Sequence, residues 1–139
     1  MSDLIQQATE NKAIVEGLYQ AFSIGDVPGV LSAMHPQIVW NEAEGNDYAN
    51  GNPYIGPEAV LNGVFGPILA DHEYFNLKDI EMHEMLHGKV LATLRYDAKY
   101  KNGKAYNAQV AHFWKVENGK ITEFQQYVDT RKLHEASLP

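Results

Sequence analysis

The sequence has no cysteine, no basic stripe and no long apolar run, and each of these absences excludes a class of function. Without cysteine there can be no disulfide, no catalytic thiolate and no iron–sulfur or cysteine-ligated zinc centre. Eleven basic against 18 acidic residues give a formal net charge of −7, so we expect no nucleic-acid partner. No stretch could span a bilayer, and residues 1–24 lack the basic start of a signal peptide. We therefore expect a cytoplasmic protein with no membrane partner.

What is present is an ordinary globular composition in a length that suits one domain. Of the 139 residues, 45% are hydrophobic and 21% are charged, and chains of this size bury most of the surface that unfolding exposes. Eight tyrosines, five phenylalanines and two tryptophans are sufficient for an aromatic core and a lined cavity. We expect a single domain covering residues 1–139.

The N-terminal part of the chain predicts two helices. Apolar residues recur at three- and four-residue spacing before Gly25, a residue typical of helix ends; this stripe comprises Ile14, Val15, Leu18, Tyr19 and Phe22. Asp26 can cap a second, short helix. That helix is expected to run to Met34 and to end at His35-Pro36, because a residue before proline disfavours helical backbone.

The next segment predicts a strand, a loop and a third helix. Residues 37–43 contain a β-branched and aromatic run that favours a strand. Residues 44–56 are rich in glycine and asparagine, and a loop of this length indicates a functional role. A helix is expected from Pro57 to about Ala70, with a kink at Pro67 because proline lacks a backbone donor.

The second half of the chain predicts an antiparallel meander. Two Asn-Gly turns, Asn102-Gly103 and Asn118-Gly119, connect three runs that favour strands, at residues 89–101, 105–116 and 121–128. Residues 73–86 are ambiguous, and their alternation mildly favours a strand. Helices followed by a meander indicate an α+β fold in which helices cover one face of a curved sheet.

The segment His83-Glu84-Met85-Leu86-His87 matches a zinc-protease motif, but its context argues against that function. The motif requires both histidines on one helix. Gly88 follows at once, and on a strand the two histidines would lie about 13 Å apart. We expect surface histidines here and no metal site.

The order of these elements and four motifs resemble the SnoaL-like or ketosteroid-isomerase-like proteins of the nuclear transport factor two-like superfamily. The motifs are Ser23-Ile24-Gly25-Asp26, Tyr54-Ile55-Gly56-Pro57, the run from His112 to Ile121, and Gln126-Tyr127-Val128-Asp129-Thr130. The resemblance implies a cone-shaped barrel, in which a strongly curved antiparallel sheet wraps around N-terminal helices (a cystatin-like α+β roll) and encloses an apolar pocket. The superfamily includes isomerases, cyclases, hydrolases, dehydratases and proteins without catalysis.

The resemblance also implies candidate catalytic residues. Glu42 falls at the place of the ketosteroid isomerase base, and His112 at the place of its oxyanion-hole acid, while Leu18 replaces its tyrosine. A solvated carboxylate at the end of a strand, near a mobile loop, is the alternative for Glu42. Arg95 and Asp97 match an Arg-x-Asp pair of limonene-epoxide hydrolase. Asp129 matches the second acid of that enzyme, although it can equally cap the short helix that follows.

The phase taken from the resemblance places Arg95, Asp97, His112 and Trp114 inside the cone, because alternate residues of a strand share a face. An internal ion pair that orders the sheet is the alternative for Arg95 with Asp97, and a satisfied core histidine is the alternative for His112. For the last strand the phase stays open between Gln126 and Tyr127. Substrate-contacting aromatics are expected at Tyr19, Trp40, Tyr54, Phe65 and Trp114, although plain core packing explains them too.

Together these features predict a pocket for a small apolar, cyclic molecule. Any reaction would be cofactor-free acid–base chemistry by an isomerase, cyclase or hydrolase. The alternative is a non-catalytic ligand-binding or association module, which the loss of the isomerase tyrosine at Leu18 favours. The resemblance further implies a homodimer.

Overall fold

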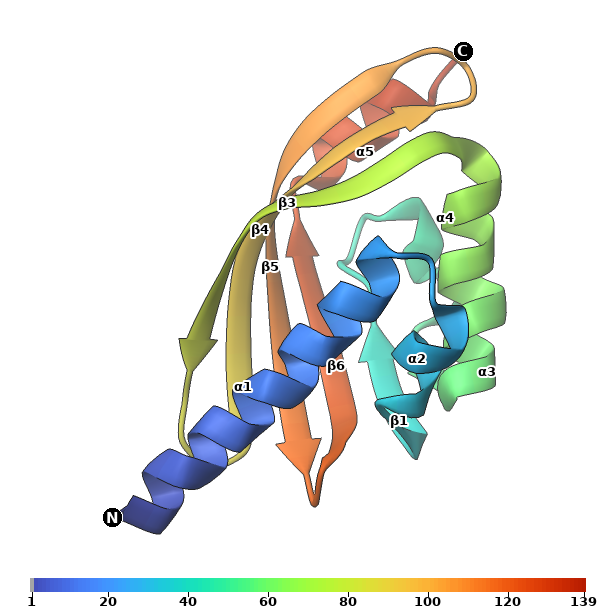
Figure 1. The fold of residues 1–139 in the computed structure, drawn as a ribbon. Helices are drawn as coiled ribbons and strands as arrows, with labels where there is room; N and C mark the ends of the chain where they lie inside the picture. The colour runs from blue at the N-terminus through green and yellow to red at the C-terminus, as the bar shows by residue number, and fades with distance from the viewer. Residues whose placement is uncertain (1) are drawn as a thin grey trace.

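The computed structural model describes residues 2–139, which form five α-helices, two further helical turns and six strands (Figure 1). The helices are α1 (Ser2–Ser23), α2 (Val27–Ser32), α3 (Pro57–Val60), α4 (Gly66–Asp71) and α5 (Thr130–Ser137), with a 3-10 turn η1 (Asp47–Gly51) and a π-helical turn η2 (Leu61–Phe65). The strands are β1 (Met34–Asn41), β2 (Tyr54–Ile55), β3 (His72–Glu84), β4 (Lys89–Tyr100), β5 (Ala105–Glu117) and β6 (Lys120–Val128).

The six strands form one curved sheet in the order β2-β1-β6-β5-β4-β3. The β1–β6 pair is parallel and the other pairs are antiparallel. Register shifts interrupt three of these pairs, and such bulges bend a sheet. α1 crosses one face of the sheet, beside α2 and the α3–α4 segment (Figure 1). The expected α+β fold is confirmed, but the sheet is open and does not close into a barrel.

The first two helices follow the sequence prediction except at the end of α2. Gly25 has a φ of +73° after α1, and the Asp26 side chain caps α2 by accepting from the Gly29 backbone N–H at 3.0 Å. The expected extension to Met34 is wrong, because β1 begins at that residue. Pro36 is tolerated in the strand since pairing with β6 is interrupted between Met34 and Val39.

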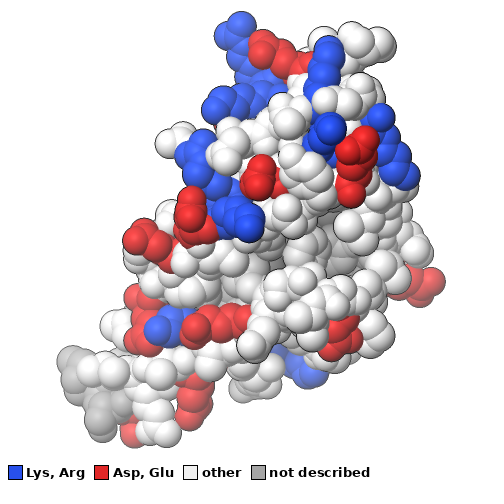
Figure 2. Space-filling view, turned by 45° about the horizontal axis from the view of Figure 1, so that its top comes forward, with Lys and Arg blue, Asp and Glu red and all other residues white. Residues whose placement is uncertain are grey.

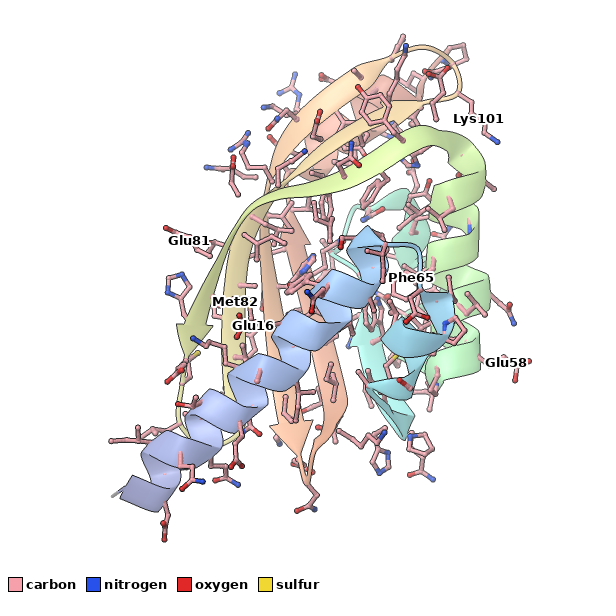
Figure 3. All side chains as sticks on the ribbon, viewed as in Figure 1. Glu16, Glu58, Phe65, Glu81, Met82 and Lys101 are labelled. Atoms are coloured by element: carbon pink, nitrogen blue, oxygen red, sulfur yellow. The ribbon has the colours of Figure 1, made fainter. Side chains whose placement is uncertain are left out.

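The expected kink at Pro67 takes the form of a π-helical turn. η2 occupies residues 61–65, and Pro67, which has no backbone N–H to donate, follows directly after this wider turn. The wider turn directs Phe65 inward, toward α1 and the sheet, while Glu58 on α3 points away (Figure 3).

Residues 72–84 form a strand, so His83 lies on β3 and His87 lies in the turn after it with a φ of +63°. The zinc-protease motif therefore lacks the helix that it needs. On the face shown in Figure 2, acidic and basic side chains are interspersed, and the basic ones gather toward one end of the molecule. No helix within residues 2–139 has both the length and the apolar character needed to cross a membrane.

Candidate functional site

A cavity lies between the sheet, α1 and the η2–α4 segment, and Phe, Tyr and Trp make up half of its lining residues. Its lining residues are Leu18, Tyr19, Phe22, Trp40, Glu42, Val64, Phe65, Ile68, Leu69, Phe75, Leu77, Tyr96, His112, Trp114, Phe124 and Gln126. About 510 Å³ of space lies between these atoms when the open mouth is counted, but only about 40 Å³ can hold the centre of a water molecule. The interior therefore has room for a few waters at most, and the smaller volume decides what fits without movement of side chains.

Glu42 is a carboxyl group buried in this apolar wall, with 2% of its surface exposed. Its Oε2 accepts from the Trp40 indole N–H at 2.9 Å, whereas its Oε1 has no hydrogen-bond partner within the described residues. Burial raises the pKa of Glu42 to about 7, against a smaller lowering by the Trp40 hydrogen bond. Near neutral pH the group is thus divided between its acid and base forms.

The loop after β1 fixes the backbone of Glu42. The Glu42 N–H donates to Asn52 Oδ1 at 3.0 Å, and Asn52 Nδ2 donates to the Glu42 carbonyl at 2.8 Å. Asn46 caps the η1 turn by accepting from the Tyr48 N–H at 3.0 Å. The 44–56 loop therefore positions the carboxyl group, and it does so through asparagine side chains that bind the backbone.

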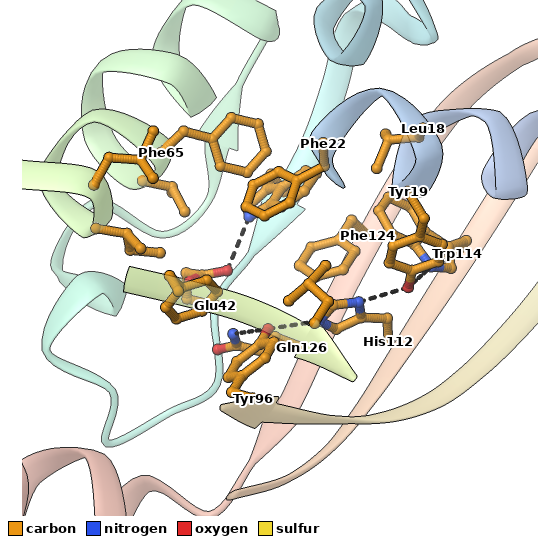
Figure 4. A pocket seen from close by; sticks show the side chains of 16 residues that line it. Leu18, Tyr19, Phe22, Glu42, Phe65, Tyr96, His112, Trp114, Phe124 and Gln126 are labelled. Carbon is orange, nitrogen blue, oxygen red and sulfur yellow. Dashed lines mark hydrogen bonds between the residues drawn. The ribbon is translucent and has the colours of Figure 1, made fainter. Parts of the chain in front are cut away.

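A second polar group in the cavity is centred on His112 (Figure 4). The Tyr19 hydroxyl lies 2.6 Å from His112 Nδ1, and the Tyr96 hydroxyl lies 2.6 Å from His112 Nε2. Burial lowers the pKa of His112 to about 3 and raises the pKa values of both tyrosines. The imidazole is therefore neutral at any ordinary pH, and both phenols keep their protons.

Two further side chains close this network. Trp114 Nε1 donates to the Tyr19 hydroxyl at 3.1 Å, and Gln126 Nε2 donates to the Tyr96 hydroxyl at 2.9 Å. Gln126 Oε1 accepts from the Ala43 N–H at 3.1 Å and from Asn46 Nδ2 at 2.8 Å. The His112 network and the loop that carries Glu42 are thus joined through Gln126.

Of the predicted aromatic residues, four line the cavity and one does not. Tyr19, Trp40, Phe65 and Trp114 are part of its wall. Tyr54 instead donates to the Tyr48 carbonyl at 2.6 Å and supports the 44–56 loop from outside the cavity. Glu42 and His112 line the cavity as well. The missing hydrogen-bond partner of Glu42 Oε1 is seen only in the structure and could not be predicted from the sequence.

The expectation that Arg95 and Asp97 point into the cone is wrong. Even-numbered residues of β4 from Val90 to Tyr100 are buried, while Arg95 and Asp97 lie on the outer face. Arg95 is paired with Gln109, and its Nε donates to Asn107 Oδ1 on that same face. Neither residue lines the cavity, and no Arg95–Asp97 ion pair forms in the described structure.

Asp129 also lies outside the cavity. Its side chain accepts from the Lys132 N–H at 3.3 Å and caps α5, as the alternative reading of the sequence had it. It borders a groove on the outer sheet face with Gln109 and Tyr127. In β6 the phase is settled, because Gln126 is buried and Tyr127 is exposed.

Sequence reasoning missed Tyr96, Gln126, Phe22 and Phe124 as cavity residues. Tyr96 follows from the register of the β4–β5 hairpin, in which Tyr96 is opposite Ala108 and Ala92 is opposite His112. Residues directly opposite in an antiparallel pair share a face. If the register is shifted by one residue, Arg95 and Asp97 face the cavity and Tyr96 faces outward.

No group of three His, Asp or Glu side chains within residues 2–139 could hold a metal ion.

Comparisons with known proteins agree on the fold. A family model described as a SnoaL-like domain matches residues 15–124. An NTF2-like protein from Burkholderia thailandensis is 27% identical, with a TM-score of 0.87 over 93% of this chain and 98% of that one. A candidate polyketide cyclase from Pseudomonas putida is 19% identical, with a TM-score of 0.77 over 91% and 96% of the two chains. The protein TerC, co-crystallised with polyporic acid, is 23% identical, with a TM-score of 0.83 over 92% and 98%. No curated protein matches the sequence.

Proposed function

The chain belongs to the SnoaL-like domain family, and from that premise we propose that it is a small-molecule pocket protein in which Glu42 acts as a general base on an enolisable ketone. The observation that carries this proposal is the buried, half-satisfied carboxyl group of Glu42. One oxygen is held by Trp40 and the other has no partner among the described residues. A buried polar atom without a partner is costly, so its retention favours a role toward a ligand.

The pKa of Glu42 suits this role. A general base works best when its pKa lies near the working pH, and burial raises that of Glu42 to about 7. At neutral pH a substantial fraction is ionised, and the proton it takes up is easily given back. An exposed glutamate, with a pKa near 4.3, would be ionised but weaker as a base.

The chemistry balances without a cofactor. Glu42 takes a proton from the carbon next to a carbonyl, the C–H bond breaks, and its electron pair moves to the carbonyl oxygen as an enolate. A neutral donor of the His112 network stabilises that oxygen by a hydrogen bond. In a β,γ-unsaturated ketone, return of the proton from Glu42 to the γ-carbon shifts the double bond and completes an isomerisation. In a diketone, attack of the enolate carbon on the second carbonyl forms a C–C bond, and the proton on Glu42 passes to the resulting alkoxide to complete a cyclisation.

The wall of the cavity favours a small apolar ligand. Its aromatic side chains include Trp40 stacked on Phe124, with ring centroids 3.8 Å apart. Since the space for water centres is only about 40 Å³, a cyclic ketone must displace side chains at the mouth. The least buried of the lining side chains is Leu69, which is 52% exposed, and Phe22 and Phe65 are half-buried. The candidate polyketide cyclase and the TerC complex support a small-molecule role for this fold.

A non-catalytic ligand-binding protein is the second candidate, because one observation favours it. Both tyrosine hydroxyls of the cavity are within 2.6 Å of His112, and groups bonded to one another are less available to a substrate. In that case a small ketone would bind to the cavity without reaction.

The test is exchange of the α-hydrogens of cyclohexanone in D₂O, followed by proton NMR. The wild-type protein is expected to accelerate exchange, and Glu42→Gln to abolish the acceleration. Glu44→Gln is the matched control, because Glu44 lies two residues away, is exposed and does not line the cavity. Equal rates for wild type and Glu42→Gln would refute the base assignment. Binding of cyclohexanone without acceleration would favour the second candidate.

A further inference from the structure

His112, Tyr19 and Tyr96 together carry three hydrogens on nitrogen or oxygen, but only two short hydrogen bonds join the three side chains. A neutral imidazole has one N–H, and each of the Tyr19 and Tyr96 hydroxyls has one hydrogen. The two contacts of 2.6 Å that join these groups take one hydrogen each. One of the two hydroxyl hydrogens must therefore point away from His112.

The outer partners of the network cannot take that hydrogen. Trp114 Nε1 is only a donor, so the Tyr19 oxygen accepts from it at 3.1 Å. The amide of Gln126 is oriented by the Ala43 backbone N–H, which donates to Gln126 Oε1 at 3.1 Å. Gln126 Nε2 therefore faces Tyr96 and donates to it at 2.9 Å. The Tyr19 oxygen thus accepts from Trp114 and the Tyr96 oxygen accepts from Gln126, so neither of these donors can take the remaining hydroxyl hydrogen.

Two arrangements satisfy these constraints. In the first, Tyr19 donates to His112 Nδ1, the imidazole hydrogen is on Nε2 and points at the Tyr96 oxygen, and the Tyr96 hydroxyl hydrogen is free. In the second, Tyr96 donates to His112 Nε2, the imidazole hydrogen is on Nδ1, and the Tyr19 hydroxyl hydrogen is free. The surroundings of the two tyrosines decide between them.

The unpartnered oxygen of the site lies on the Tyr96 side. Glu42 Oε1 is the one buried oxygen or nitrogen without a hydrogen-bond partner among the described side chains. Glu42 lies near Gln126 and Tyr96, while Tyr19 lies beyond His112 (Figure 4). Burial is the main cause of the raised pKa of Tyr96, and the charge of Glu42 is the second. For Tyr19, burial raises the pKa and the Trp114 hydrogen bond lowers it, with no contribution from Glu42. A free hydroxyl hydrogen is favoured beside this carboxyl group.

We propose that Tyr96 is the hydrogen-bond donor that the cavity presents to a ligand carbonyl, and that His112 is a positioning residue whose hydrogen is on Nε2. Tyr19 and Trp114 hold the imidazole in this tautomer, and the imidazole in turn directs the Tyr96 hydroxyl hydrogen away from itself. This inference rests on the proposed function, and it assigns contact with the enolate oxygen to Tyr96 instead of to His112, the residue that the resemblance implied.

The pairing of Tyr96 with Glu42 defines the class of ligand. A carbonyl oxygen accepts from Tyr96 while an acidic hydrogen on the neighbouring carbon faces Glu42 Oε1. Ketones with an α-hydrogen meet this requirement, and so do enolised 1,3-diketones, in which an O–H takes the place of the C–H. A ligand with a carbonyl and no such hydrogen would leave Glu42 Oε1 without a partner, which binding disfavours.

The tautomer is tested without any ligand by ¹⁵N NMR of the histidine rings, with the His112 signals assigned by their absence in His112→Asn. Ring nitrogens with and without hydrogen have distinct ¹⁵N shifts, and we expect the hydrogen on Nε2 at pH 8, where most of Glu42 is ionised. A hydrogen on Nδ1 would overturn the proposal, because Tyr96 would then be donating to His112.

The donor role is tested with the cyclohexanone exchange assay and Tyr96→Phe. Loss of one donor to a developing oxyanion costs about 100-fold or more in rate, so a loss of that order is expected with the pH midpoint retained. Tyr106→Phe is the control, because it removes a buried hydroxyl that lies 2.9 Å from His72 Nε2 and outside the cavity. The control is expected to keep the wild-type rate.

The outcomes separate this inference from the proposed function. If Glu42→Gln is inactive and Tyr96→Phe retains full activity, Tyr96 is not the donor and the base assignment stands. If the wild-type protein does not accelerate exchange, the proposed function and the donor role both fail. The ¹⁵N spectrum then still decides which hydroxyl hydrogen is free.

Discussion

Substitution of Glu42 by glutamine should change how the stability of the protein depends on pH. The pKa of Glu42 is raised from 4.5 to about 7 by burial, so the folded state binds a proton that the unfolded state releases between these values. Its contribution to stability is fully present below pH 4.5 and is lost as the pH rises through 7. At 1.36 kcal/mol per pH unit, the 2.5 pH units correspond to about 3 kcal/mol.

His112 acts in the opposite direction. Its pKa is lowered by burial from 6.5 to about 3, so the unfolded state binds the extra proton, and stability is lost as the pH falls from 6.5 toward 3. Between pH 4.5 and 6.5 the two effects cancel in the wild-type protein, and the stability contributed by this site is flat. In Glu42→Gln only the histidine effect remains, so stability should rise by roughly 3 kcal/mol over the same interval.

The assay is urea unfolding of both proteins at several pH values between 4 and 8, followed by the fluorescence of the buried Trp40 and Trp114. Groups that both proteins share contribute equally and disappear from the difference. The difference in free energy of unfolding, variant minus wild type, should increase by about 3 kcal/mol from pH 4 to pH 8. Parallel pH dependences of the two proteins would refute an elevated pKa for Glu42.

Three further outcomes are expected. Asp129→Ala should lower the free energy of unfolding, measured with urea, by about 1 kcal/mol because the α5 cap is lost. The rate of ketone exchange should not change, and a loss of that activity would mean that Asp129 takes part in catalysis. Arg95→Gln and Asp97→Asn should both keep the wild-type exchange rate, because these side chains lie on the outer face of the sheet; a large loss from either would mean that the outer face takes part in the reaction. The homodimer that the resemblance implies should be seen as a species of about twice 15.6 kDa in sedimentation at micromolar concentration, and a monomer would contradict it.

Local signals in the sequence were sufficient for most of the fold. Asn118-Gly119 forms the expected two-residue turn, with both residues at positive φ and Glu117 opposite Lys120. The Asp26 cap and the terminating Gly25 follow from the side-chain and backbone properties of single residues. The end of α2 did not follow, because pairing of β1 with β6, a contact distant in sequence, determines where the strand begins.

The register of the hairpin at Asn102-Gly103 contradicts the placement of Arg95 and Asp97 that the resemblance implied. A two-residue loop would set Lys101 opposite Lys104 and put Arg95 and Asp97 on the face of His112. The actual loop has three residues: the Tyr100 N–H donates to the Lys104 carbonyl, and Gly103 has a φ of +93°. This shifts the register by one residue and turns Tyr96 inward instead.

Glu42 and His112 were placed in the cavity by resemblance, and their surroundings could not be read from sequence. The neutral state of His112 and the elevated pKa of Glu42 arise from burial by residues of several elements. The partnership of His112 with Tyr19 joins α1 to β5 across 93 residues. Such contacts depend on the packing of the helix against the sheet, which no local pattern specifies.

The pH profile of ketone exchange tests the role of Glu42 most directly. The rate of α-hydrogen exchange catalysed by the wild-type protein should rise with pH as Glu42 ionises, with a midpoint near 7. Glu42→Gln should show no catalysed rate at any pH. A midpoint near the ordinary glutamate value of about 4.3, or a catalysed rate that survives in Glu42→Gln, would contradict a buried Glu42 base.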